Sequence, residues 1–155
     1  MSEISKPVLP WGSDTRAAQE GETDMGKTIL AVVVGFVAWF AVALGLGTAM
    51  RASWPAYAAV ADAMTFTLPM MFARLSLGVL GSLVSGWLTG KIATHRMAAT
   101  VALGVALLVF FIPEHIQLWD KFPLWYHLFF LTSLVPLAVL GGRLRATTSP
   151  RPLQA

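Results

Sequence analysis

The side chain with the clearest potential for chemistry is Arg74, which lies in an apolar stretch that begins at Leu68. Arginine stays charged at any ordinary pH, and a charge inside a membrane segment normally faces the interior of the helix bundle and pairs there. If a helix begins at Leu68, Arg74 lies about two turns inside it. If the helix begins near Arg74, its guanidinium can reach the lipid headgroups. Arg74 can therefore be a headgroup contact, half of a structural ion pair, or a ligand site.

The possible partners of Arg74 are three acidic residues that we expect on the same side of the membrane: Asp62, Glu114 and Asp120. His115 follows Glu114 in a predicted loop, and two histidines with several carboxylates can in principle bind a divalent metal. Their spacing matches no metal motif, so interfacial hydrogen bonding is the role we expect for His127. The predicted ligand or ion-pair candidates are Arg74, Asp62, Glu114, Asp120 and His127.

Several classes of chemistry have no residues to support them. The chain has no cysteine, which excludes disulfides, thiolate metal sites and iron–sulfur clusters. His95 is expected on the opposite side from His127, which argues against a haem held by two histidines. No H-E-x-x-H, G-x-S-x-G or P-loop motif occurs, and the first apolar stretch lacks the acidic residue of a small proton-coupled exporter. The sequence predicts no catalytic residue, no metal, no cofactor and no enzymatic activity.

The element that must position these residues is the stretch from Leu75 to Ile92, which is apolar and rich in small residues. Small residues spaced by three or four positions let two helix backbones approach closely in a bilayer. On a helical wheel, Arg74 lies on the same face as these small residues and away from the bulky ones. Packing within one chain and packing between two chains both fit the pattern. The predicted helix-packing residues are Gly78, Gly81, Ser82, Ser85, Gly86 and Gly90.

The composition of the chain indicates an integral membrane protein. Of its 155 residues, 56% are hydrophobic and 12% are charged, and a charged fraction of about 25% is usual for a soluble domain. We predict a transmembrane domain at 27–145, with helices at about 28–49, 68–92, 95–112 and 123–142, the third ending at Pro113. A short interfacial helix is expected within 50–66. Disordered tails are predicted at 1–26 and 146–155.

Lysine and arginine set the predicted orientation. With the N-terminus inside, eight of the 11 basic residues fall on inner segments and three on outer ones. The prediction is an all-α integral membrane protein, a four-transmembrane-helix up-down bundle with both termini cytoplasmic. Short loops and abundant Gly, Ala and Trp suggest a bacterial inner membrane. The net charge is +3, but the basic residues are scattered singly along the chain and form no cluster, so nucleic acid is not expected as a partner.

Three functional hypotheses remain. The first is a non-enzymatic accessory or oligomerising subunit that acts through helix packing, with the lipid bilayer and a homo- or hetero-oligomeric membrane partner. The second is a small transporter or channel with Arg74 at an outer-side site. The third is a membrane enzyme at the outer interface that uses Glu114, His115, Asp120 and His127.

Overall fold

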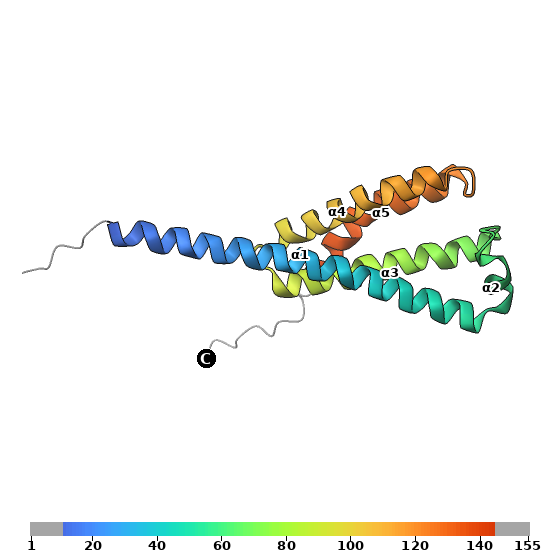
Figure 1. Cartoon of the computed structure of the whole chain (residues 1–155), viewed down its shortest axis with the longest axis horizontal. Helices are drawn as coiled ribbons and strands as arrows, with labels where there is room; N and C mark the ends of the chain where they lie inside the picture. The colour runs from blue at the N-terminus through green and yellow to red at the C-terminus, as the bar shows by residue number, and fades with distance from the viewer. Residues whose placement is uncertain (1–10, 145–155) are drawn as a thin grey trace, which may run out of the picture.

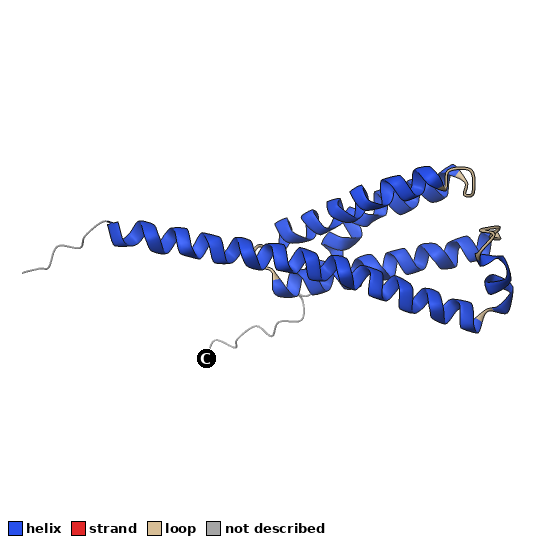
Figure 2. Ribbon diagram, viewed as in Figure 1, coloured by secondary structure: helices blue, strands red, loops and turns tan. Residues whose placement is uncertain are grey.

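The computed structural model describes residues 11–144 of the chain (Figure 1). Within these residues the chain is helical and contains no strand (Figure 2). The helices are α1 (Trp11–Ser53), α2 (Pro55–Ala61), α3 (Leu68–Ile92), α4 (Arg96–Gln117) and α5 (Leu124–Leu144). All but α2 are long and apolar enough to cross a membrane. The prediction of an all-α chain with four such helices is confirmed.

α1 begins much earlier than the sequence predicted. We expected a tail through residue 26 and a helix from Thr28, but α1 already begins at Trp11. Ala17, Ala18, Gln19 and Glu20 have high helix propensity, and adding a turn to a helix that already exists avoids the cost of nucleation. The apolar segment therefore extends its helix into the polar one, which projects alone beyond the bundle (Figure 1). Residues 1–10 and 145–155, including the tail predicted at 146–155, lie outside the described residues.

α4 also differs from the prediction, because it continues through Pro113 to Gln117. A proline inside a helix removes one backbone hydrogen bond and disturbs the preceding turn. In an apolar surrounding, however, ending the helix would leave several backbone groups without water to bind. Losing one bond costs less than losing several, so the helix continues. His115, which we expected in a loop, consequently lies in the last turn of α4.

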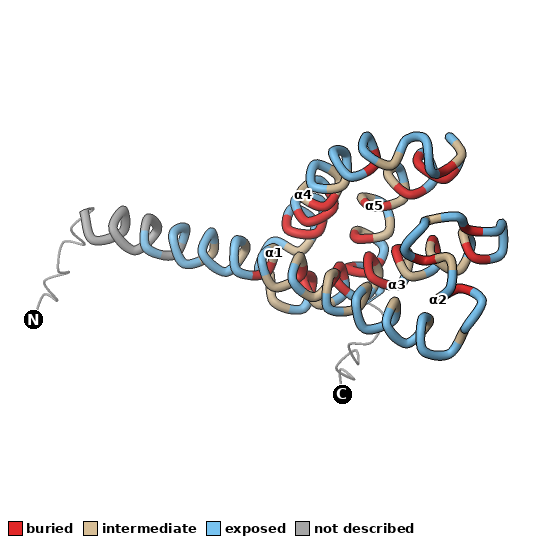
Figure 3. The backbone as a smooth tube through the Cα atoms, turned by 45° about the vertical axis from the view of Figure 1, so that its right-hand side comes forward, coloured by how far each residue is buried: buried red, intermediate tan, exposed pale blue. Residues whose placement is uncertain are grey.

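α3 has the bounds that the sequence predicted, and its small side chains face inward. Gly78, Ser82, Gly86 and Gly90 are buried, as are Gly81, Ser85 and Thr89. The large residues on the same helix face outward: Leu80, Val84 and Trp87 are all exposed. Burying small residues and exposing large ones suits a helix that packs closely on its neighbours and meets lipid on its outer side. Figure 3 shows the buried face of α3 turned toward the other helices.

The two rows of small residues on α3 contact different neighbours. A Cβ added at Gly86 would collide with the backbone of Ala138, and one at Gly90 would lie 3.0 Å from the Cα of Gly142, both in α5. The other row, Gly81, Ser85 and Thr89, faces α1. A Cβ added at Gly81 would lie 3.1 Å from the indole nitrogen of Trp39, and the Thr89 hydroxyl donates a hydrogen bond to the carbonyl oxygen of Ala31 at 3.2 Å. α3 is therefore the central helix, and its small residues are occupied by contacts within one chain.

The helix pairs separate toward the end of the molecule that carries α2. Figure 1 shows α4 and α5 diverging there from α1 and α3. Far from α2, the backbones of α3 and α5 touch at Gly86 and Gly141. Nearer α2, the ring of Phe130 fills the space between them and would lie 2.8 Å from a Cβ added at Gly78. Small residues thus close one end of the bundle, and aromatic rings hold the other end apart.

Candidate functional site

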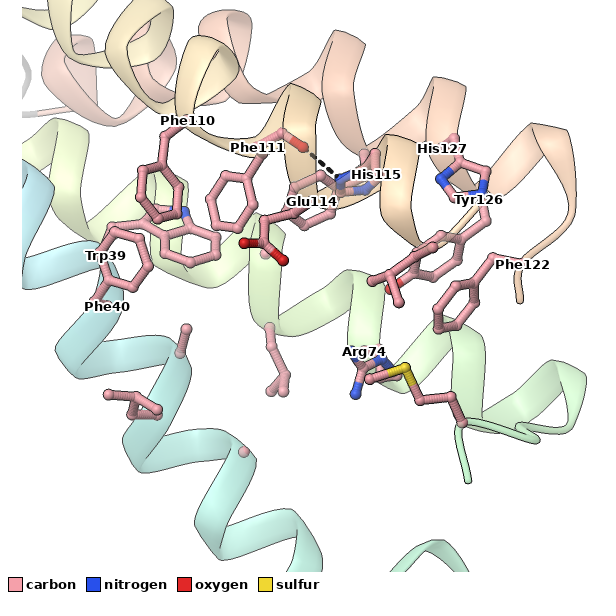
Figure 4. Close-up of a pocket in the computed structure, with 18 of the residues that line it drawn as sticks. Trp39, Phe40, Arg74, Phe110, Phe111, Glu114, His115, Phe122, Tyr126 and His127 are labelled. Atoms are coloured by element: carbon pink, nitrogen blue, oxygen red, sulfur yellow. Dashed lines mark hydrogen bonds between the residues drawn. The ribbon is translucent and has the colours of Figure 1, made fainter. Parts of the chain in front are cut away.

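A cavity of about 670 Å³ lies between the diverging helix pairs (Figure 4). This volume is within the range of small-molecule binding sites. We call it the aromatic cavity, because rings make up much of its wall: Trp39, Phe40, Tyr57, Phe110, Phe111, Phe122, Tyr126 and Phe130. Three charged side chains and two histidines also line it: Arg51, Arg74, Glu114, His115 and His127. Helices that are distant in the sequence thus contribute polar groups to one apolar space.

Arg74 contributes a cation that has no anionic partner among the described residues. Its Nη1 donates a hydrogen bond to the hydroxyl of Tyr57 at 2.8 Å. The guanidinium carbon lies 4.7 Å from the centre of the Phe66 ring and 5.7 Å from that of Phe122. Its Nε is buried without a hydrogen-bond partner. Aromatic faces and the phenols of Tyr57 and Tyr126 therefore surround a charge whose best partner would be a carboxylate or a phosphate.

Two of the acidic partners predicted for Arg74 lie elsewhere. Asp62 pairs with Arg51 at 3.1 Å, and both side chains are largely exposed. Asp62 caps the C-terminal end of α2, and α2 folds back beside the last turns of α1, so Arg51 is the cation within its reach. Asp120 is exposed and does not line the aromatic cavity. The predicted ion pair is thus replaced by a contact between Arg74 and Tyr57.

Glu114 is the predicted acidic residue that does reach the cavity of Arg74. The carboxylate is exposed, and Figure 4 shows it pointing into the space between the two helix pairs. It forms no ion pair with any described residue. Because α4 continues past Pro113, Glu114 is carried on a helix that faces α3. The cavity therefore holds a cation and an anion that do not satisfy each other.

Two histidines form one wall of the cavity. The rings of His115 and His127 have centroids 5.2 Å apart, and His127 stacks on Trp119 at 5.0 Å. His115 Nδ1 lies 3.0 Å from the carbonyl oxygen of Phe111. His115 Nε2 and both ring nitrogens of His127 are buried with no hydrogen-bond partner. Buried polar atoms are nearly always bonded, so three nitrogens are available to a ligand or to water.

Tyr57, Met64 and Tyr126 line the cavity without having been predicted as site residues. Tyr57 is 2% exposed, and its hydroxyl accepts the hydrogen bond from Arg74. Met64 has a φ of 56°, the only positive value for a non-glycine residue in the part of the chain that the structure describes. Such backbone strain is common at functional sites. The one sequence signal for Tyr57 and Met64 is that they lie in the segment 50–66, where a short interfacial helix was predicted.

The described residues contain no group of three or more His, Asp or Glu side chains placed to hold a metal ion. What the cavity offers is electrostatic contact through Arg74 and Glu114, hydrogen bonding through the histidines and apolar contact through the rings. Comparison with protein-family models, with curated proteins and with solved structures found no match to this chain. The geometry of the cavity is therefore the guide to function.

Proposed function

We propose that this protein binds an acidic ligand in the aromatic cavity, with Arg74 as the anion contact, and that this is the binding step of a small membrane transporter. The observation that carries the proposal is the guanidinium of Arg74, which lines the cavity and forms no ion pair with any described residue. An uncompensated cation within an apolar helix is unfavourable. A carboxylate or phosphate that enters the cavity offsets this cost through a two-pronged, charge-assisted contact.

The proposal includes an orientation. We place the four long helices across the membrane in an up-down arrangement with both termini cytoplasmic, as the excess of basic residues on the inner segments supports. The aromatic cavity then opens to the outer side. The composition supports a bacterial cytoplasmic membrane as the location.

Access from one side supports transport rather than a pore. The cavity lies at the α2 end, and at the other end the backbones of α3 and α5 are in contact at Gly86 and Gly141. A site reached from one side and closed on the other is the geometry of a carrier in one of its two alternating states.

Isothermal titration calorimetry of the full-length protein in nonionic detergent tests the proposal, with dodecyl phosphate as the anionic probe. Arg74→Gln should weaken binding by about thirtyfold, which is about 2 kcal/mol for a hydrogen bond to a charged group. Arg51→Gln is the matched control, because Arg51 lines the same cavity but is already paired with Asp62. Equal binding to wild type and Arg74→Gln would contradict the proposal, as would tighter binding of dodecyltrimethylammonium.

An accessory subunit that acts through helix packing is the second candidate. The observation in its favour is Gly45 in α1, which has nothing within 4 Å of the position its Cβ would occupy. That open position is where a helix of another protein can approach closely. Native mass spectrometry after gentle extraction should then show a heteromeric complex that Gly45→Leu dissociates. A complex that survives Gly45→Leu argues against this surface.

A further inference from the structure

Glu114 restricts which acidic ligand the cavity can accept. It faces the same space as Arg74, from α4 rather than α3, and has no ion pair among the described residues (Figure 4). A ligand that carries only negative charge would gain at Arg74 and lose by repulsion at Glu114. A ligand with an anionic group and a cationic group would satisfy both side chains. The two unpaired charges thus indicate a zwitterion.

His115 indicates which chemical type of cationic group the ligand carries. The carbonyl oxygen of Phe111 can only accept a hydrogen bond, so the His115 Nδ1 at 3.0 Å carries the proton. In the neutral ring, Nε2 is then an acceptor, and it is buried without a donor. His127, at 2% exposure, also lines the cavity with both ring nitrogens unpartnered. A primary ammonium has three N–H groups for such acceptors, whereas a quaternary ammonium has none.

Much of the remaining wall of the cavity is apolar and includes Trp39, Phe40 and Phe110 (Figure 4). Aromatic faces accept both a cation and an apolar body. We infer, on the basis of the proposed function, that the ligand is a zwitterion whose phosphate or carboxylate lies at Arg74 and whose primary ammonium lies at Glu114 and His115. A phosphoethanolamine group has this chemistry, either as a lipid headgroup or as a free molecule.

Calorimetry with short-chain lipids on the full-length protein tests this inference. The probes are dihexanoyl phosphatidylethanolamine, its phosphatidylglycerol analogue, which lacks the cation, and its phosphatidylcholine analogue, which lacks the N–H donors. The ethanolamine lipid should bind about tenfold more tightly than either analogue. Glu114→Gln should remove the preference over the glycerol lipid, because it weakens binding of the ethanolamine lipid and strengthens binding of the glycerol lipid. Asp120→Asn is the matched control, since Asp120 lies on the same side of the molecule but outside the cavity.

The outcomes separate the inference from the proposed function. One outcome is that Arg74→Gln weakens the binding of all three lipids while Glu114→Gln leaves the order of their affinities unchanged. In that case the inference of a zwitterionic ligand is wrong, and the proposed anion site at Arg74 is supported. If Arg74→Gln has no effect on any lipid, both fail. Free phosphoethanolamine identifies the source: equal affinity indicates a soluble zwitterion, and tenfold weaker binding indicates a lipid. Glu114→Ala gives a second test of the same side chain, and the melting temperature of each variant is measured alongside.

Discussion

The two ends of α3 show how one helix can serve two purposes. Around Gly86 and Gly90, α3 meets α5 backbone to backbone, and no space remains for a side chain. Two turns away, Gly78 meets the ring of Phe130, and the helices separate around the aromatic cavity. Both contacts use glycine. What differs is the partner residue, which is small at the closed end and aromatic at the open end.

This difference separates the residues that hold the bundle together from those that meet a ligand. At the closed end the buried residues are small and make close van der Waals contact. At the open end, among the described residues, there are charges without ion-pair partners and ring nitrogens without hydrogen-bond partners. Substitutions at the closed end should therefore affect stability first, and substitutions at the open end should affect binding first.

The largest effect should come from Gly86→Leu. A Cβ at this position collides with backbone atoms of Ala138, which cannot move aside as a side chain can. We expect a loss of about 3 kcal/mol or more of folding stability, seen as a fall in melting temperature and in the yield of folded protein. Gly45→Leu is the control, because nothing lies within 4 Å of its Cβ position. Equal melting temperatures for the two variants would mean that α3 and α5 do not pack as described.

Arg74→Met should increase the folding stability, whereas Gly86→Leu should decrease it. The change to methionine removes a partly buried cation that has no counter-charge among the described residues, and it keeps a long side chain against Phe66 and Phe122. We expect a gain of about 1 kcal/mol, because a charge that lies among apolar side chains without an opposite charge is costly and methionine removes it. Thermal unfolding in detergent measures this gain, and binding of dodecyl phosphate should be lost in the same sample. A strongly destabilised variant would make Arg74 a structural residue.

Gly78→Ala sharpens the comparison with Gly86. Its Cβ would lie 2.8 Å from the end of the Phe130 ring, a side chain that can shift by rotation. We expect a cost of about 1 kcal/mol, smaller than that of alanine at Gly86, where the obstacle is backbone. Melting temperatures of the two alanine variants make this comparison directly. If Gly78→Ala proves the more damaging, the open end is packed as rigidly as the closed one.

The hydrogen bond between Trp39 and Ser82 should give the smallest effect. It joins α1 to α3 at 3.1 Å in the interior of the bundle. Interhelical hydrogen bonds in membrane proteins contribute about 0.6 kcal/mol on average. A double-mutant cycle with Trp39→Phe and Ser82→Ala should return a coupling energy of that size. A coupling energy near zero would mean that the indole contributes through packing alone.

Much of the fold could be predicted from sequence, and little of the cavity. The bounds of α3 followed from an apolar stretch that opens with Leu68-Pro69 and ends before His95 and Arg96. The predicted end of α4 at Pro113 was wrong, because the rule that proline ends a helix comes from chains in water. Arg74 was singled out from the sequence, but its contact with Tyr57 depends on how α2 folds back. No local pattern encodes that direction, nor the divergence of the helix pairs that creates the cavity.

Pro113 has a consequence for how the protein moves. The residues just after it, Glu114 and His115, belong to the C-terminal end of α4, which lacks one backbone hydrogen bond to the preceding turn. A helix bends more easily where a backbone hydrogen bond is missing, so Pro113 is a point at which α4 can change its direction. Collective motions of this kind occur over microseconds to milliseconds. The residues proposed to meet the ammonium group thus follow a point where α4 can bend, while Arg74 lies on the central helix.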